Sequence, residues 1–228
     1  MRAIALLSGG LDSVVAAWAA RREWELVLAL TFDYGQRARE CEIQAARAVA
    51  RRLSCAHVVL PLPWLGALGK SALTDPSAHV PALASEQLDD LGQSTETAAA
   101  VWVPNRNGVF LNVAASYADA MDCRAIVVGF NVEEAATFPD NSAEFMDVAG
   151  RFFALSTQAH PRVVSPTVGL DKARIVTLAR EIGAPIGLVW SCYHGGEEHC
   201  WQCESCNRLR RALQRAGAWE AWQAGELA

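Results

Sequence analysis

The stretch Ala3-Ile4-Ala5-Leu6-Leu7-Ser8-Gly9-Gly10-Leu11-Asp12-Ser13 decides the fold of this chain of 228 residues. An apolar run leads directly into a polar turn with two adjacent glycines, and a helical pattern follows over about 13–22. Buried parallel strands are typically such short apolar runs, and glycines allow a sharp turn from a strand into a helix. The stretch therefore predicts the strand, loop and helix that open an α/β sheet.

Further apolar runs and helical patterns alternate along the rest of the chain. Strands are predicted at about 26–32, 57–62 and 125–128, and helices at about 37–53, 107–121 and 175–182. Asp171 is placed to cap the last of these helices, and Gly183 is placed to end it. Because parallel strands need crossover connections, the alternation favours an α/β fold with a mostly parallel sheet flanked by helices. Residues 70–100 are polar and lack periodicity, so they predict a surface insertion or lid.

The composition excludes several classes of protein. A hydrophobic fraction of 52% with 20% charged residues is typical of a globular domain and excludes extensive disorder. The formal net charge of -5 gives no diffuse basic field, so we expect no direct contact with nucleic acid. No apolar run reaches the 18 or so residues of a membrane span, and the N-terminus lacks a full signal sequence. We therefore expect no membrane association and a cytoplasmic location.

The turn at residues 8–13 has the chemistry of a phosphate-binding loop. Glycines let backbone N–H groups approach an anion, and the N-terminus of the following helix adds unpaired donors and positive potential. Ser8 and Ser13 add hydroxyl groups. The turn matches neither the dinucleotide fingerprint G-x-G-x-x-G nor the Walker pattern G-x-x-x-x-G-K-[ST]. The alternative is a glycine turn in which Asp12 or Ser13 only caps the helix.

Four cysteines near the C-terminus have the spacing of metal ligands: Cys192, Cys200, Cys203 and Cys206. Four thiolates typically bind zinc tetrahedrally and leave no open position, which predicts one structural Zn²⁺ in a C-terminal segment. His194 or His199 could replace one cysteine. An iron–sulfur cluster is the main alternative, but its usual cysteine run ends in Cys-Pro, whereas Asn207 follows here.

The pattern Ser-Gly-Gly-x-Asp-Ser over residues 8–13 resembles the PP-loop of the N-type ATP pyrophosphatases. These enzymes activate an oxygen atom as its adenylate and release pyrophosphate. The resemblance implies a Rossmann-like fold of the adenine nucleotide alpha hydrolase type. It also implies that Ser8, Gly9, Gly10, Leu11, Asp12 and Ser13 hold ATP, with Asp12 helping to position Mg²⁺ or the polyphosphate.

Three more segments extend the resemblance to the 7-cyano-7-deazaguanine synthase family: 31–37, 103–107 and 190–206. The family makes the nitrile precursor of queuosine and archaeosine. The resemblance implies an ATP-dependent ligase that converts 7-carboxy-7-deazaguanine and ammonia into the nitrile, through an adenylated acid and an adenylated amide. It also implies a homodimer. Because the chain has little room for a glutaminase unit, free or channelled ammonia is expected.

Carried over to this chain, the resemblance gives a set of candidate site residues. Asp12, Ser13 and Lys172 are the catalytic candidates, and Asp33 and Gln36 join the loop at the nucleotide. The candidates for substrate contacts are Tyr34, Arg106, Asn107, Glu134 and Asp140. The last two lie in the stretch 129–142, where many family members carry a different sequence around Phe138-Pro139-Asp140. The predicted organisation is an ATP-binding domain at 1–190 and a zinc-binding segment at 191–228 packed on it.

Two alternative functions stay open at this point. One is a PP-loop enzyme that amidates or thiolates another acceptor, including RNA. The other is a non-catalytic zinc-binding interaction module with a purely structural glycine turn. The second alternative predicts no turnover of ATP and free replacement of Asp12 and Ser13.

Overall fold

A five-stranded parallel sheet forms the centre of the computed structural model, which describes residues 1–227. The strand order is β3-β2-β1-β4-β5. The strands are β1 (Arg2–Leu6), β2 (Glu25–Asp33), β3 (Ala56–Pro61), β4 (Ala125–Val127) and β5 (Arg162–Val164). In β1, Ala5 is paired with Ala29 of β2 on one side and with Val127 of β4 on the other. The predicted parallel α/β sheet is confirmed.

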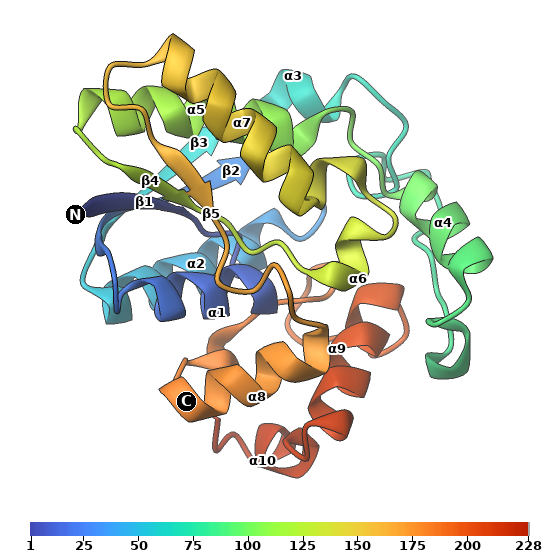
Figure 1. Cartoon of the computed structure of the whole chain (residues 1–228). Helices are drawn as coiled ribbons and strands as arrows, with labels where there is room; N and C mark the ends of the chain where they lie inside the picture. Colours follow the sequence, from blue (N-terminus) through green and yellow to red (C-terminus); the bar gives the residue numbers. More distant parts are fainter. Residues whose placement is uncertain (228) are drawn as a thin grey trace.

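Helices cover both faces of this sheet (Figure 1). The helices α1 (Leu11–Ala20) and α2 (Arg39–Leu53) lie on one face, and α5 (Arg106–Ala120) and α7 (Ala143–Ser156) lie on the other. Successive residues of a strand point to opposite faces. Thus Ala3 and Ala5 belong to the core with α1, whereas Ile4 belongs to the core with α5. Both faces are apolar, as expected for strands that are covered on both sides.

Three helices at the C-terminal end of the chain pack beneath α1: α8 (Lys172–Ile182), α9 (Glu204–Arg215) and α10 (Trp219–Gln223). The predicted cap of α8 is confirmed, since Asp171 accepts a hydrogen bond of 2.7 Å from the Arg174 N–H. Gly183 ends the helix in the left-handed conformation, with φ +64°. Residues of α8 and α9 share one core with α1, so the packing continues across residue 190.

The segment between β3 and α5 lies outside the layered part of the molecule (Figure 1). It contains α3 (Pro63–Gly66), the short 3-10 helix η1 (Ser85–Gln87) and α4 (Leu91–Ala100). Sequence periodicity did not indicate α4, because this helix buries little more than Ser94 and Ala98. The segment contacts α9 through two hydrogen bonds. The Glu204 N–H donates to the Pro81 carbonyl, and the Asn207 side chain donates to the Leu83 carbonyl. A lid function stays a prediction.

The remaining short elements are α6 (Val132–Ala135), η2 (Pro139–Asn141) and η3 (Ile186–Leu188). Both α6 and η2 lie in the stretch 129–142 that follows β4. No helix among residues 1–227 combines the length and the apolar character needed to cross a membrane.

Candidate active site

A cavity of about 280 Å³ opens at the carboxyl ends of β1, β2 and β4. Its wall includes the loop after β1, the ends of β2 and β4, and residues of α5, α6, α8 and α9. The strand order changes direction at β1, because β2 and β3 extend the sheet on one side and β4 and β5 on the other. Ligands of open α/β sheets bind at this kind of switch point.

The loop after β1 is held by its own hydrogen bonds. The Ser13 hydroxyl donates to the Gly10 carbonyl at 3.0 Å and lies 3.0 Å from the Ser8 hydroxyl. Gly9 has φ +85°, and a Cβ atom there would lie 2.6 Å from the Glu42 carbonyl oxygen of α2. No side chain caps the N-terminus of α1, so its first-turn N–H groups are available to an anion in the cavity.

The end of β4 passes directly against this loop. A Cβ atom at Gly129 would lie 2.4 Å from the Ser13 nitrogen and 2.5 Å from the Asp12 carbonyl carbon. Only glycine permits this approach without displacement of the backbone. The sequence analysis did not predict this approach.

Lys172 joins the loop to α6 by two short ion pairs. Its Nζ donates to Asp12 Oδ2 at 2.6 Å and to Glu134 Oε1 at 2.8 Å. The Lys172 side chain is 11% exposed and that of Asp12 is 16% exposed. The structure thus brings together three residues that lie far apart in the sequence and that the resemblance had selected separately.

The pKa values of the three groups reflect this close contact. Burial raises the pKa of Asp12 to about 6; the nearby Lys172 ammonium opposes this shift and the Glu134 carboxylate adds to it. Burial lowers the pKa of Lys172, but the two carboxylates outweigh burial and raise it overall, so the ammonium stays protonated. Burial would raise the pKa of Glu134, yet Lys172 holds it below its usual value. Of the two carboxyl groups, Asp12 is therefore protonated more readily than Glu134.

The other end of the cavity is aromatic. Phe32 and Phe110 stack with ring centroids 4.0 Å apart, and the Tyr34 ring lies 5.8 Å from Phe110. Arg106 donates a hydrogen bond of 3.1 Å to the Tyr34 hydroxyl. Glu42 of α2, which the sequence analysis did not select, also lines this end, and burial raises its pKa.

Several other candidates take structural hydrogen bonds. Asp140 accepts from the Asn107 N–H at 3.1 Å, so it caps α5. Asp33 accepts from the Gly35 N–H at 3.0 Å, and Gln36 donates to Glu42 at 2.9 Å. In the described part of the chain, Asp33 and Asp140 do not line the cavity, whereas Gln36 and Asn107 do.

Sequence analysis missed a group of charged residues that connects α9 to the cavity. Arg208 donates to Glu204 Oε1 from two nitrogens, at 2.7 and 2.9 Å, and lies 3.4 Å from Glu133 of α6. Glu133 in turn accepts from the Lys172 backbone N–H at 2.8 Å. The helical i,i+4 spacing of Glu204 and Arg208 was visible in the sequence, but the direction in which this pair points was not.

The four clustered cysteines fit a single metal ion. The sulfur atoms of Cys192, Cys200, Cys203 and Cys206 all lie within 4.8 Å of one another. Tetrahedral zinc, with bonds of about 2.3 Å, places its sulfur ligands about 3.8 Å apart, and the Cys200 and Cys206 sulfurs are 3.9 Å apart. Among residues 1–227, neither His194 nor His199 joins the cluster. The His199 Nε2 instead accepts from the Ser191 N–H at 3.1 Å.

The cysteine segment is connected to the phosphate loop by a backbone hydrogen bond. The Trp190 N–H donates to the Gly9 carbonyl at 2.9 Å, two residues before the first cysteine of the cluster. The Trp190 ring also packs against His199 in a tilted arrangement, with ring centroids 4.6 Å apart. The position of the loop therefore depends in part on how the cysteine segment is held.

The fold and the site define the class of this protein: a nucleotide-binding α/β protein with a PP-loop at the end of its first strand. A family model described as "Queuosine biosynthesis protein QueC" matches residues 2–217, and the chain belongs to that family.

Relatives named 7-cyano-7-deazaguanine synthase match at high coverage. The chain is 49% identical to the one from Pelotomaculum thermopropionicum and 50% identical to the one from Desulforudis audaxviator, over 95% of this chain and 98% of each relative. A structure titled NMN synthetase, from Francisella tularensis, covers 99% of this chain and 86% of that chain at 15% identity, with a TM-score of 0.45. That likeness is too low to bear on the site.

Proposed function

We propose that this chain is a 7-cyano-7-deazaguanine synthase. It condenses 7-carboxy-7-deazaguanine with ammonia and removes water to give the nitrile, at the expense of ATP. The observation that carries the proposal is the match to the family over residues 2–217, in a chain whose PP-loop, Lys172 and Glu134 meet in one cavity. Membership of this family favours the synthase over an RNA-modifying enzyme or a non-catalytic zinc module.

The reaction needs two activations of oxygen. In the first, a carboxylate oxygen attacks the α-phosphorus of ATP, pyrophosphate leaves, and ammonia then displaces AMP to form the amide. In the second, the amide oxygen attacks the α-phosphorus of another ATP and a second pyrophosphate leaves. Loss of AMP and of the two amide protons then gives the nitrile. This chemistry needs no covalent enzyme nucleophile, so positioning and charge stabilisation carry the catalysis.

Residues at the loop end of the cavity suit the departing pyrophosphate. The first-turn N–H groups of α1 and the Ser8 and Ser13 hydroxyls are the donors, and Lys172 supplies a fixed positive charge. Asp12 Oδ1 is buried and has no hydrogen-bond partner within the described residues, which fits a ligand for Mg²⁺. Such an ion would offset the charge of the leaving oxygens.

The aromatic end of the cavity suits planar rings. Phe110 and Tyr34 offer stacking surfaces, and Arg106 offers donors for a carboxylate. Glu134 is the acidic candidate that lines the cavity, and it supports recognition of the N–H groups of a deazaguanine better than Asp140, whose carboxylate caps α5. Gln36 lines this end, and Asp33 supports it from outside the cavity through its bond to the Gly35 N–H.

We assign the four-cysteine cluster to one structural Zn²⁺ per chain. Four thiolates leave no position for a water ligand, so the ion would hold the segment before α9 and would take no part in the chemistry. The homodimer and the cytoplasmic location stay predictions.

The test is a reconstitution with purified protein, ATP, Mg²⁺, ammonium and 7-carboxy-7-deazaguanine. AMP is followed by chromatography and the acceptor by mass spectrometry. We expect nitrile and AMP to form together, and we expect amide to accumulate when ATP is limiting.

Asp12→Asn keeps the size of the side chain but removes its charge, so it should slow AMP formation by about a hundredfold or more. Wild-type protein that leaves the acid unchanged would contradict the proposal. Unimpaired turnover in the Asp12 variant would contradict the assigned role of the loop.

A further inference from the structure

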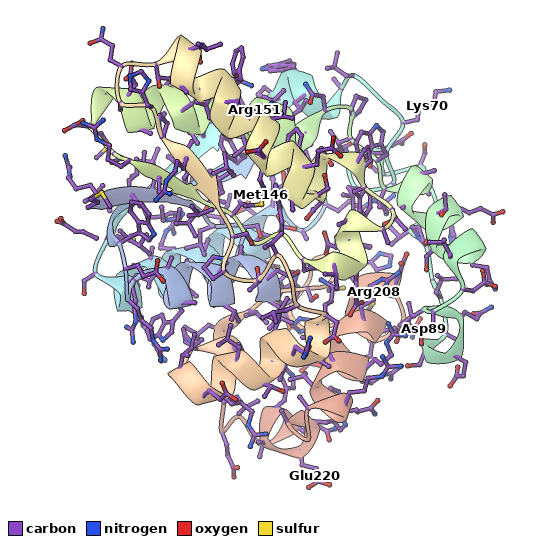
Figure 2. The ribbon with its side chains drawn as sticks, viewed as in Figure 1. Lys70, Asp89, Met146, Arg151, Arg208 and Glu220 are labelled. Carbon is purple, nitrogen blue, oxygen red and sulfur yellow. The ribbon has the colours of Figure 1, made fainter. Side chains whose placement is uncertain are left out.

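Arg208 reaches the cavity from the cysteine segment. It lies one helical turn after Glu204 on α9, and α9 begins directly after Cys203. Figure 2 labels Arg208 between α9 and α6, close to the centre of the molecule. Its side chain is 17% exposed, and it lines the same cavity as Ser8, Asp12 and Lys172.

The guanidinium of Arg208 is held on one edge and weakly engaged on the other. Nε and Nη2 both donate to the same oxygen of Glu204, at 2.9 and 2.7 Å, and Nη2 also lies 3.2 Å from the Ser94 hydroxyl. Nη1 is 3.4 Å from Glu133, longer than the 2.7–2.9 Å of a good charge-assisted bond. Arg211 approaches the same Glu133 oxygen at 3.6 Å and shares its charge.

The other cations of the cavity wall are placed differently. Lys172 is shared between Asp12 and Glu134. Arg37 donates from one nitrogen to the carbonyls of Asp75 and Ala78, and Arg106 donates one hydrogen bond, to Tyr34 at the aromatic end. Arg208 differs from both arginines because Glu133 joins it to Lys172 beside the phosphate loop, so its partly available Nη1 edge is placed for an anion at that end of the cavity.

We propose that Arg208 is a binding residue of the active site and that its Nη1 edge contacts an oxyanion of the reactants. This oxyanion is a phosphate of the departing pyrophosphate or the carboxylate of the acid acceptor, since a guanidinium binds both in the same forked geometry. Glu204 orients the guanidinium, and Ser94 of α4 adds a neutral contact. The inference rests on the proposed function, because that function supplies both oxyanions.

The experiment measures binding to four intact proteins by titration calorimetry: wild type, Arg208→Lys, Arg208→Gln and the control Arg215→Lys. Arg215 lies on the same helix and is half exposed, with Asp89 as its partner, and it does not line the cavity in the described chain. One arm uses magnesium pyrophosphate. The other arm uses 7-carboxy-7-deazaguanine together with the non-transferring analogue α,β-methylene ATP. Adenosine serves as a ligand without an oxyanion.

We expect Arg208→Lys to weaken one arm by about tenfold, because lysine keeps the charge but loses the fork, while adenosine binding stays unchanged. The arm that weakens identifies the oxyanion. Arg208→Gln should weaken it further, and Arg215→Lys should match the wild type.

Affinities within about twofold of the wild type in both arms for Arg208→Lys would overturn the proposal. An equal loss of adenosine binding would overturn it as well, because that loss marks a structural role. Wild-type protein without affinity for either anion would also exclude it. If the wild type binds pyrophosphate but forms no AMP with the acid, the proposed function is wrong. The pyrophosphate titrations then still test whether Arg208 binds an oxyanion.

Discussion

The loop at residues 8–13 and the segment at residues 190–206 both form walls of one cavity, but they keep their shapes by different means. The loop lies between a central strand and a helix, and hydrogen bonds between Ser8, Gly10 and Ser13 close it locally. The cysteine segment has no helix or strand of its own before Glu204, and its small apolar cluster is built around the cysteines and Val80. The first shape is encoded within a few residues, whereas the second requires a cross-link.

The largest expected effect is loss of the metal from the cysteine segment. Structural zinc contributes about 10–16 kcal/mol of binding free energy in zinc-finger peptides, so Cys203→Ser should leave the segment unfolded. We expect loss of bound metal, rapid proteolysis within 190–206 and a lower melting temperature, with the sheet still intact by circular dichroism.

Cys41→Ser is the matched control for this prediction. Cys41 Sγ lies 3.1 Å from the Gly196 carbonyl oxygen, next to the segment but outside the cluster. A Cys203→Ser protein that keeps its metal and its protease resistance would remove the contrast between the two regions.

The second prediction concerns Lys172, through which the phosphate loop is tied to α6. Lys172→Met leaves the carboxylates of Asp12 and Glu134 without their buried counter-charge, so the free energy of unfolding should fall by about 3–5 kcal/mol. AMP formation should fall by about a hundredfold or more. Chemical denaturation and the AMP assay measure the two effects.

Lys70→Met is the control, because Lys70 is exposed in the segment before α4 and is labelled at the edge of the molecule in Figure 2. Equal stability of the two methionine variants would argue against a buried ion pair at the loop.

The smallest expected effect is a difference in stability between alanine variants of the two loop glycines, Gly9 and Gly10. Gly9→Ala forces a side chain into positive φ against α2, and it should lower the free energy of unfolding by about 1–3 kcal/mol. Gly10 has φ -76°, and a Cβ atom there would meet nothing closer than 3.5 Å, so Gly10→Ala should change stability by less than about 1 kcal/mol. Denaturant midpoints compare the two variants, and a larger loss at Gly10 would contradict the loop geometry described above.

The sequence predicted most of the sheet, the loop and the capped helix α8, because each depends on neighbouring residues. Asp171 and Gly183 bracket α8 as their residue types indicate. The contact of Lys172 with Asp12 spans 160 positions, and local patterns carry no information about it. Arg208 escaped notice for the same reason: its partners Ser94 and Glu133 come from two other segments.

The sequence was a poorer guide to site residues whose polar side chains form hydrogen bonds with the main chain. Asp140 was selected as a possible partner of the substrate, but its carboxylate lies against the first turn of α5. Whether a polar side chain turns toward a ligand or toward a neighbouring main chain depends on tertiary packing. The helix α4 was missed because its alanine-rich and polar sequence has no apolar face for periodicity to detect.

At Gly129 the arrangement of neighbouring strands leaves no room for a side chain. This glycine follows β4, the direct neighbour of β1, by two residues, so it shares space with the backbone of Asp12 and Ser13. Gly129 itself therefore offers no room for a change of side chain, whereas the residues of α6 and η2 that follow it are free of that steric conflict and are where an engineered change of acceptor would begin.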